Sequence, residues 1–545
     1  MDSDASWGIC CSKEDVGSKI KVKKKTMKSA LSMITIMIVF TQVYPRDSLH
    51  LIATMTGEKT DDKFRVVAGV GDVNGDGYDD VLVGAPGGNY AKLYFGGSPF
   101  DTLADLSFAP ESQGFFGYSV AGGGDVNGDG FPDIVIGAPY YTPGPPYYLD
   151  SAGKAYVFLG GPQMDTIPDV TMEGTVFRSM LGNSVSFAGD MNKDGYDDII
   201  IGAPFDGTFA QGRAYIYFGG ADMDSIADVS IEGQETHDML GESVSGVGDV
   251  NGDGFDDILI GAPQDLKGES GKVYLFLGGH EINFENSKRF VDQSIPQYGS
   301  FGRIVARLED INKDGFSDFG ILALDKINIY LGETMIDTIP NLILFPGTNF
   351  CYLGGLGDLN KDGFDDFVAV SKYVNIFFGN TFLDTVPDIP LSFWAMPVCG
   401  LGDINGDSHI DIGFGRGGGW DPTGKVYIYS YGIGNNVEKK KELNYPENFR
   451  LKQNYPNPFN SSTTISYDLS DPYSVRLEIF NCSGQKIKIL VSEKQKSGSY
   501  NITWNGKDLN DQIVSSGIYF VKMMVETLNM TKKQQVKTQK IVLLR

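Results

Sequence analysis

Short apolar runs bounded by Gly, Pro and Asp recur along most of the chain. In the stretch from residue 117 to residue 173, four such runs follow one another, at 117–122, 133–139, 153–160 and 169–173. Runs of this length, rich in β-branched residues and closed by turn residues, predict strands. The same four runs return in unit after unit, so the pattern predicts repeated sheets of four antiparallel strands.

An acidic nonapeptide marks each unit and lies between its first and second strands. It begins at Asp72, and copies begin at residues 125, 190, 249, 310, 358 and 403, about 55 residues apart on average. Seven units of four strands predict a seven-bladed β-propeller, because a linear β-solenoid would need a shorter repeat. The seventh unit lacks a fourth strand, and residues 49–57 resemble one. We therefore expect residues 49–57 to form the outer strand of the seventh blade.

The nonapeptides have the ligand pattern of a calcium loop. Carboxylate or amide oxygens stand at positions 1, 3, 5 and 9, glycine at position 6 permits a sharp turn, and position 7 can offer its carbonyl oxygen. A set of oxygen ligands suits Ca²⁺ better than Zn²⁺ or Cu²⁺, and a flexible loop suits it better than Mg²⁺. The sequence predicts up to seven structural Ca²⁺ sites, with these ligands: Asp72, Asn74, Asp76, Tyr78, Asp80; Asp125, Asn127, Asp129, Phe131, Asp133; Asp190, Asn192, Asp194, Tyr196, Asp198; Asp249, Asn251, Asp253, Phe255, Asp257; Asp310, Asn312, Asp314, Phe316, Asp318; Asp358, Asn360, Asp362, Phe364, Asp366; Asp403, Asn405, Asp407, His409, Asp411.

A cluster of Asx turns without an ion is the alternative interpretation of these loops. The seventh loop departs most from the pattern, since Ser408 replaces glycine at position 6. Four loops carry an additional acid at position 8, and we expect these side chains to face water rather than a metal ion: Asp79, Asp197, Asp256 and Asp365.

Composition narrows the function classes. The chain has 545 residues, 70 of them Gly, and a formal net charge of −25. Such an acidic balance argues against nucleic acid as a partner, which requires a basic surface. With only 4 His and 5 Cys, a zinc framework or a disulfide scaffold is not expected.

Two short motifs in the units resemble FG-GAP repeats, the β-propeller repeats of the integrin α type. The Gly-Ala-Pro motif stands at 84–86, 137–139, 202–204 and 261–263, and Phe-Gly stands at 116–117 and 301–302, with Leu-Gly variants at 181–182 and 240–241. Units five to seven lack Gly-Ala-Pro, and unit one lacks Phe-Gly. The resemblance implies that the loops bind Ca²⁺ on one face of the propeller and that partners are met mainly on the other.

Aromatic residues lie on the connections expected at that other face. The connections between second and third strands carry Tyr147 and Tyr148 in unit two and Trp420 in unit seven. Exposed Tyr and Trp side chains are typical of binding surfaces and of sugar stacking. Tyr147, Tyr148 and Trp420 are therefore candidate ligand-binding residues; the alternative is that they pack onto neighbouring blades.

Both ends of the chain carry export features. A lysine-rich stretch followed by the apolar run 30–40 predicts a secretory signal peptide within residues 1–47, too short for a membrane span. The propeller is expected over 48–431 and a polar linker over 432–447. Residues 448–545 contain about seven short strands, which predict a small immunoglobulin-like β-sandwich. No transmembrane segment is expected in the mature chain.

The last domain resembles the type A C-terminal sorting domain of the type IX secretion system. The matching parts are residues 453–459, Ser483-Gly484, residues 498–500 with Trp504, residues 516–520 and a basic-apolar tail. The resemblance implies recognition by the type IX machinery, passage through the periplasm, and release or attachment at the outer cell surface. A plain immunoglobulin-like adhesion module is the alternative.

The sequence favours a non-catalytic calcium-binding module that recognises an extracellular protein or glycan. The four His residues are scattered, no serine-hydrolase or zinc-protease motif appears, and the paired carboxylates belong to the acidic loops. Two alternatives remain: a secreted enzyme that cleaves a polysaccharide or phosphodiester with carboxylates from different blades, and a structural surface scaffold.

Overall fold

The chain folds as two compact units, Met1–Asn435 and Asn436–Arg545. The structure, a computed structural model, describes residues 47–543 except 111–113, 144–149, 264–270, 293–299, 324–325, 345–351, 382, 419–420, 434–448, 453, 458, 470–471, 482–485, 510–511 and 528–533. Apart from one 3₁₀ turn, η1 (Phe284–Asn286), every regular element within the described residues is a strand. The all-β class predicted from the sequence is confirmed.

The described part of the first unit contains seven four-stranded antiparallel sheets, each listed from its inner strand outward. They are β2 (Val66–Gly71), β3 (Asp80–Ala85), β4 (Tyr90–Tyr94), β5 (Leu106–Phe108); β6 (Ser119–Gly124), β7 (Asp133–Ala138), β8 (Lys154–Phe158), β9 (Val170–Glu173); β10 (Ser184–Gly189), β11 (Asp198–Ala203), β12 (Arg213–Tyr217), β13 (Val229–Glu232); β14 (Ser243–Gly248), β15 (Asp257–Ala262), β16 (Lys272–Phe276), β17 (Ser287–Phe290); β18 (Ile304–Glu309), β19 (Asp318–Leu322), β20 (Ile327–Tyr330), β21 (Leu342–Leu344); β22 (Tyr352–Gly357), β23 (Asp366–Val370), β24 (Val374–Phe377), β25 (Ile389–Pro390); β26 (Val398–Gly402), β27 (Asp411–Gly418), β28 (Asp421–Ile433) and β1 (Asp47–Thr56).

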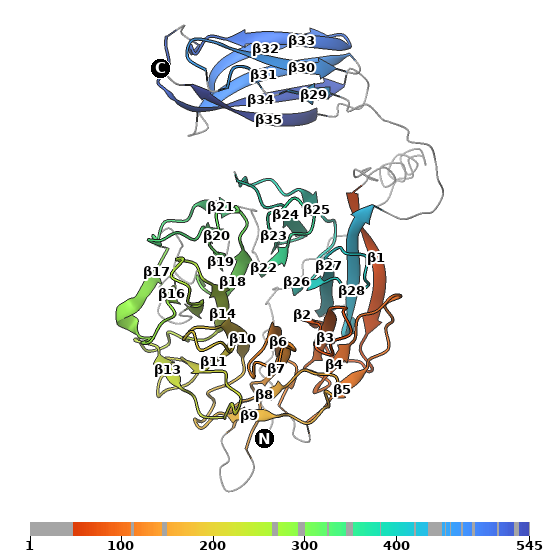
Figure 1. The fold of residues 1–545 in the computed structure, drawn as a ribbon, viewed down its shortest axis with the longest axis vertical. Coiled ribbons are helices and arrows are strands. Elements are labelled where there is room, and N and C mark those ends of the chain that lie inside the picture. The colour runs from red at the N-terminus through yellow and green to blue at the C-terminus, as the bar shows by residue number, and fades with distance from the viewer. Residues whose placement is uncertain are drawn as a thin grey trace, which may run out of the picture. The chain divides into compact units, whose positions relative to one another are not determined.

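The sheets are arranged as the blades of a propeller (Figure 1). Each innermost strand contacts the innermost strand of the next sheet, and β26 contacts β2, so the ring is closed. The second strands of the first six sheets, such as β7 with the sequence DIVIGA, are buried at every residue because adjacent sheets cover both of their faces. A strand covered on both faces is apolar throughout and does not alternate. The cores lie between neighbouring sheets; one joins Leu82 of the first sheet to Ile134 and Ile136 of the second.

The ring is closed by strands from the two ends of the first unit. β1 pairs antiparallel with β28, from Asp47 opposite Ile433 to Thr56 opposite Lys425, and is the outermost strand of the last sheet. This is the outer strand predicted for residues 49–57. Pairing the first strand of the unit with its last one means that the ring closes only when the whole repeat array has folded.

The Phe-Gly and Gly-Ala-Pro motifs meet between blades. A Cβ on Gly84 would lie 2.2 Å from the carbonyl oxygen of Gly117, and the N–H of Gly117 donates to Gly137 O at 3.1 Å. The Phe116 side chain before this glycine is fully buried. The glycines are therefore needed for the close approach of adjacent backbones, and the preceding Phe or Leu anchors the turn in the core.

The second unit is a sandwich of two sheets around one core. Its strands are β29 (Phe449–Leu451), β30 (Thr463–Leu469), β31 (Tyr473–Asn481), β32 (Lys486–Gln495), β33 (Gly498–Trp504), β34 (Gly517–Thr527) and β35 (Gln534–Leu543), in the orders β29-β30-β33 and β32-β31-β34-β35. Trp504 and Tyr467 are the largest of its fully buried side chains. The proline-rich entry segment is anchored to the last strand, since Val542 N donates to Asn457 Oδ1 at 2.8 Å.

Candidate metal centres

Each acidic loop joins the inner strand of a blade to the second strand, and its first Asp folds the loop. In the second blade, Asp125 Oδ1 accepts the N–H groups of Gly128 and Asp129 at 2.7 and 3.1 Å, and Oδ2 accepts that of Gly130 at 2.8 Å. One carboxylate thus satisfies three consecutive backbone donors, which is an extended form of the Asx turn. The aspartate at position 1 has this bonding to positions 5 and 6 in all seven loops.

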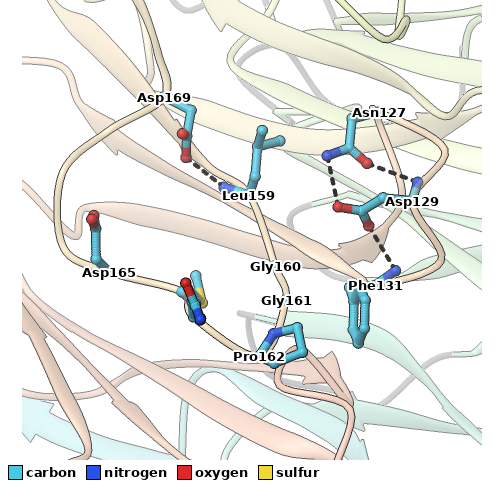
Figure 2. A pocket seen from close by; sticks show the side chains of 11 residues that line it. Asn127, Asp129, Phe131, Leu159, Gly160, Gly161, Pro162, Asp165 and Asp169 are labelled. Carbon is cyan, nitrogen blue, oxygen red and sulfur yellow. Dashed lines mark hydrogen bonds between the residues drawn. The ribbon is translucent and has the colours of Figure 1, made fainter.

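Positions 3 and 5 form a second layer of polar groups (Figure 2). Asn127 Nδ2 donates to Asp129 Oδ2 at 3.0 Å, Asp129 N donates back to Asn127 Oδ1 at 2.9 Å, and Phe131 N donates to Asp129 Oδ1 at 3.0 Å. The side chains at positions 1, 3 and 5 therefore turn toward the interior of the loop. The carbonyl of position 7 lies on the loop backbone directly after them.

The aspartate at position 9 is the first residue of the second strand and is fully buried in every blade. Asp133 Oδ2 accepts from Val126 N at 2.8 Å and Oδ1 from Gly160 N at 2.7 Å, so it joins the loop to the end of the third strand. Burial raises the pKa of Asp133 to about 7, against the lowering effect of these two hydrogen bonds. The same cause raises the pKa of Asp318 to about 8. A bound cation would favour the ionised form of these groups.

The oxygen ligands of the loops fit a hard cation. One loop oxygen also has no hydrogen-bond partner among the described residues. Asn312 Oδ1, at position 3 of the fifth loop, is a buried acceptor with no hydrogen-bond partner in the described structure. Buried acceptors are nearly always satisfied by protein, water or an ion. In the described conformation the carboxylates bind loop N–H groups, and no group of three or more His, Cys, Asp or Glu side chains within the described residues has its ligand atoms gathered for a metal ion.

The seventh loop differs from the others in its bonding. Asn405 Nδ2 donates to both oxygens of Asp411, at 3.2 and 2.9 Å, instead of to position 5. Asp407 Oδ2 accepts from Ser430 Oγ at 3.0 Å. His409 at position 7 bonds through Nδ1 with the carbonyl oxygen of Asp407 at 3.0 Å. In this loop, carboxylate oxygens of Asp407 and Asp411 that the sequence pattern assigns to calcium therefore accept hydrogen bonds from neighbouring side chains.

The acids at position 8 do more than face water, because they also bind the backbone of an adjacent blade. Asp197 Oδ2 accepts the N–H of Asp125 at 2.8 Å, and Asp197 N donates to Asp125 O at 3.1 Å, so position 8 of one loop binds position 1 of the preceding blade's loop. Asp79, Asp256 and Asp365 bind Asp403, Asp190 and Asp310 in the same way. We call these four contacts the interblade latches. The sequence gives no sign of them, because each joins residues of different repeats.

A second recurring acidic loop lies beside the acidic nonapeptides. In the second blade, Asp165 Oδ1 accepts Ile167 N at 2.7 Å and Asp169 Oδ2 accepts Leu159 N at 2.9 Å. The same two turn contacts recur with Asp101 and Asp105, Asp224 and Asp228, Asp337 and Asn341, and Asp384 and Asp388. A cavity of about 500 Å³ lies between Asp165, Asp169 and the loop residues Asn127 and Asp129 (Figure 2). Sequence reasoning missed these loops, although their spacing repeats with the blades.

The three candidate recognition residues, Tyr147, Tyr148 and Trp420, lie outside the described residues. Their role therefore stays a prediction. The neighbouring Tyr140 is described; it is 39% exposed and its ring contacts those of Phe115 and Tyr118.

Two protein-family models match parts of the chain. The FG-GAP repeat model matches residues 64–98, 116–158, 181–217 and 240–276, the first four blades. The secretion system C-terminal sorting domain model matches residues 453–537. Neither model is that of an enzyme family. The described part of the chain contains no apolar helix of membrane-spanning length.

Integrin α chains are among the curated relatives of this chain. Integrin alpha-5 of Xenopus laevis is 32% identical over 211 residues, covering 37% of this chain and 20% of its own length. Integrin alpha pat-2 of Caenorhabditis elegans is 34% identical over 212 residues, covering 35% and 17%. Integrin alpha-4 of Xenopus laevis is 28% identical over 286 residues, covering 50% and 26%. The chain thus spans about a fifth of the length of the first two relatives.

The chain of BBS1N in its complex with ARL6DN superposes with a TM-score of 0.45 at 9% identity, covering 72% of this chain and 99% of that one, which is too low to establish a shared fold. The assignment to known families therefore depends on the match of the FG-GAP repeats and of the C-terminal sorting domain. The sorting domain indicates a protein that is secreted or attached to the outer cell surface. The chain therefore carries integrin-α-like FG-GAP repeats and ends in a type IX secretion sorting domain.

Proposed function

We propose that the protein is a non-catalytic recognition module of the cell exterior, stabilised by Ca²⁺, that binds an extracellular protein or glycan. The observation that carries the proposal is the similarity of its propeller repeats to integrin α chains, on a chain that also has an export domain. Binding is assigned to the face opposite the acidic loops, because the loops are occupied with holding the strand connections and the adjacent blades together.

Ca²⁺ is the proposed cofactor, with a structural role. In each loop, the side chains at positions 1, 3, 5 and 9 and the carbonyl of position 7 would hold the ion. Bound Ca²⁺ would neutralise the carboxylates and lock the turn between the first two strands. The unpartnered Asn312 Oδ1 and the oxygen-only donor set support this assignment. The altered bonding of Asn405 and Asp407 makes the seventh loop the weakest site.

Removal of Ca²⁺ tests the cofactor. EDTA should lower the melting temperature of the full chain by many degrees, and added Ca²⁺, but not equimolar Mg²⁺, should restore it. Asp194→Ala should abolish one binding event in a calorimetric titration, whereas Asp403→Ala should have the smallest effect among the position-1 and position-5 variants. A melting temperature indifferent to EDTA, or equal losses from all seven loops, would contradict the assignment.

The enzyme alternative requires a cleft that gathers two carboxylates outside the loop ligands. The cavity beside the second acidic loop does contain Asp165 and Asp169, but both carboxylates accept turn N–H groups. A similar cavity with Asp384 and Asp388 recurs in the sixth blade. Recurrence in several blades favours a structural role for these acids. Arrays of extracellular proteins and glycans test the proposal; no binding on either array, together with turnover of a polysaccharide, would overturn it.

A further inference from the structure

A cavity of about 610 Å³ lies on the axis of the propeller, at the end opposite the acidic loops. It is lined by residues from all seven blades, most of them at or directly before the start of the innermost strands. Arg65, Tyr118, Asn183, Glu242, Arg303 and Met396 each stand within two residues before such a strand. Volumes of 300–1,000 Å³ are typical of sites for small ligands.

The wall of this cavity is basic, although the chain carries a net charge of −25. Among its described lining residues, Arg65, Arg303 and Arg307 are cationic and Glu242 is anionic, so the lining has a net charge of +2. The cavity at the loop end of the axis, about 470 Å³, contains Asp197 and Asp256 together with Arg307. The described lining of the loop-end cavity therefore has a net charge of −1 and that of the opposite cavity +2, with Arg307 counted in both.

Two of these arginines are available for a ligand. Arg307 Nε is paired with Glu309 Oε2 at 2.6 Å. Arg65 is half-buried and its Nη1 donates to Gly417 O at a long 3.5 Å, while Arg303 is exposed. Within the described chain, no carboxylate lies at ion-pairing distance from either Arg65 or Arg303. A half-buried guanidinium without an acidic partner is well placed to bind a carboxylate in two parallel hydrogen bonds.

Hydroxyl, amide and aromatic groups complete the surroundings. Asn183, Ser184 and Ser243 line the cavity, and the two serine oxygens each accept a backbone N–H, which leaves their hydroxyl hydrogens for other acceptors. Tyr118 lines the cavity and is 40% exposed, and its ring contacts that of Tyr140, which is 39% exposed, with centroids 6.1 Å apart. Burial raises the pKa of Tyr118, the charge of Glu242 adds to this rise, and the charges of Arg65 and Arg303 oppose it.

We propose that this axial cavity binds an acidic saccharide, with Arg65 and Arg303 on the sugar carboxylate. The serine and asparagine groups match sugar hydroxyls, and the Tyr118–Tyr140 pair offers a ring face for stacking. These groups favour a polyhydroxylated anion over an acidic peptide, whose side chains carry no hydroxyl array. The inference rests on the proposed recognition function and specifies its ligand.

The test uses the calcium-loaded full chain and three probes in calorimetric titrations. A galacturonate tetramer should bind, its methyl ester of the same length should bind at least tenfold more weakly, and hexa-aspartate should not bind. Arg303→Gln should weaken galacturonate binding about tenfold, and Arg65→Gln by a similar factor, as expected for loss of a charged hydrogen bond. Arg289→Gln, on the exposed outer strand β17, removes the same charge and should change nothing.

Arg303 is exposed, so its variant remains informative if Arg65→Gln fails to fold. Equal affinity for the acid and its methyl ester, or equal losses in the Arg303 and Arg289 variants, would overturn the proposal. Binding of hexa-aspartate alone would also overturn it in favour of an acidic protein. Binding of neutral glycans or of proteins through another surface would leave the recognition function standing and remove only this inference, whereas no binding to any protein or glycan would remove both.

Discussion

At the scale of single residues, the acidic loop needs a backbone that an ordinary side chain opposes. Position 6 has φ between 85° and 94° in six loops, where it is glycine, and 64° at Ser408 in the seventh. A non-glycine residue in the left-handed region costs about 1–2 kcal/mol. The hydrogen bond from position 6 to Oδ2 of position 1 is nevertheless kept, at 2.7 Å from Ser408 N to Asp403. The loop therefore keeps its shape in the seventh blade at an energetic cost.

Ser408→Gly should relieve this strain. We expect an increase in stability of up to about 1 kcal/mol, since the gain in the folded loop is partly offset by the greater freedom of glycine in the unfolded chain. Thermal or urea unfolding in EDTA measures the effect without interference from metal. Ser408→Ala is the matched control, because it removes the hydroxyl but keeps the strain; a glycine variant no more stable than the alanine variant would contradict the explanation.

At the scale of elements, the inner strands end in glycine because the next blade packs against them. A Cβ on Gly189 would lie 2.2 Å from Asp256 Oδ2, and Gly189 has φ of 73°. The fifth blade departs from this rule, with Glu309 at φ of 61°. Burial raises the pKa of Glu309, and Arg307 opposes this shift from two residues earlier on the same strand. The latch acids Asp256 and Asp79 thus constrain Gly189 and Gly402 at the ends of the preceding strands.

Removal of one latch should loosen one junction between blades. Asp197→Ala deletes the acceptor for Asp125 N and should cost about 0.5–1.5 kcal/mol, the usual net contribution of a hydrogen bond. Hydrogen exchange should show faster exchange at Asp125 and in its loop, with the distant loop at residues 358–366 unaffected. Asp197→Asn keeps an acceptor oxygen and should retain most of the protection. Equal exchange in both variants would show that the latch does not hold this junction.

At the scale of the whole molecule, seven buried carboxyls respond to pH together. Burial raises the pKa of the position-9 aspartates to about 7, and to about 8 at Asp318. The pKa of these carboxyls in the folded state lies above the value near 4 that they have in the unfolded chain. Between these two pKa values, the calcium-free folded state therefore binds more protons than the unfolded state. Its stability is consequently highest at low pH within that window and falls as the pH rises through 7.

Calcium binding should show the opposite dependence, since the ion and the protons compete for the same carboxylates. Melting curves in EDTA at pH 5.5 and pH 8 should give the lower melting temperature at pH 8. Calcium should raise the melting temperature more at pH 8, and its affinity should fall by up to about tenfold for each pH unit below 7 at a site that releases one proton. A calcium affinity independent of pH over this range would mean that these carboxyls are already ionised without the metal.

Much of this protein could be read from its sequence because the relevant physics is local. Period-two and fully apolar runs identify strands, and the spacing of Asp, Asn and Gly in nine residues specifies a loop that folds on its own carboxylate. The outer strand near residues 49–57 was also predictable, because the last repeat lacked one strand. The chemistry of the sorting domain likewise lies in contiguous segments such as residues 453–459.

Contacts between repeats were decided only by the tertiary structure. Asp197 looked like a solvated acid, and its partner Asp125 lies in another blade; nothing in either nonapeptide indicates that they meet. Arg65 and Arg303 stand in unremarkable positions before their strands, and only closure of the ring brings them to one cavity. The sequence by itself determined the repeats and their loops, because turns and strands follow from neighbouring residues. The axial cavity and the latches depend on where each blade lies around the propeller axis. These positions are set by the packing of all seven sheets against one another.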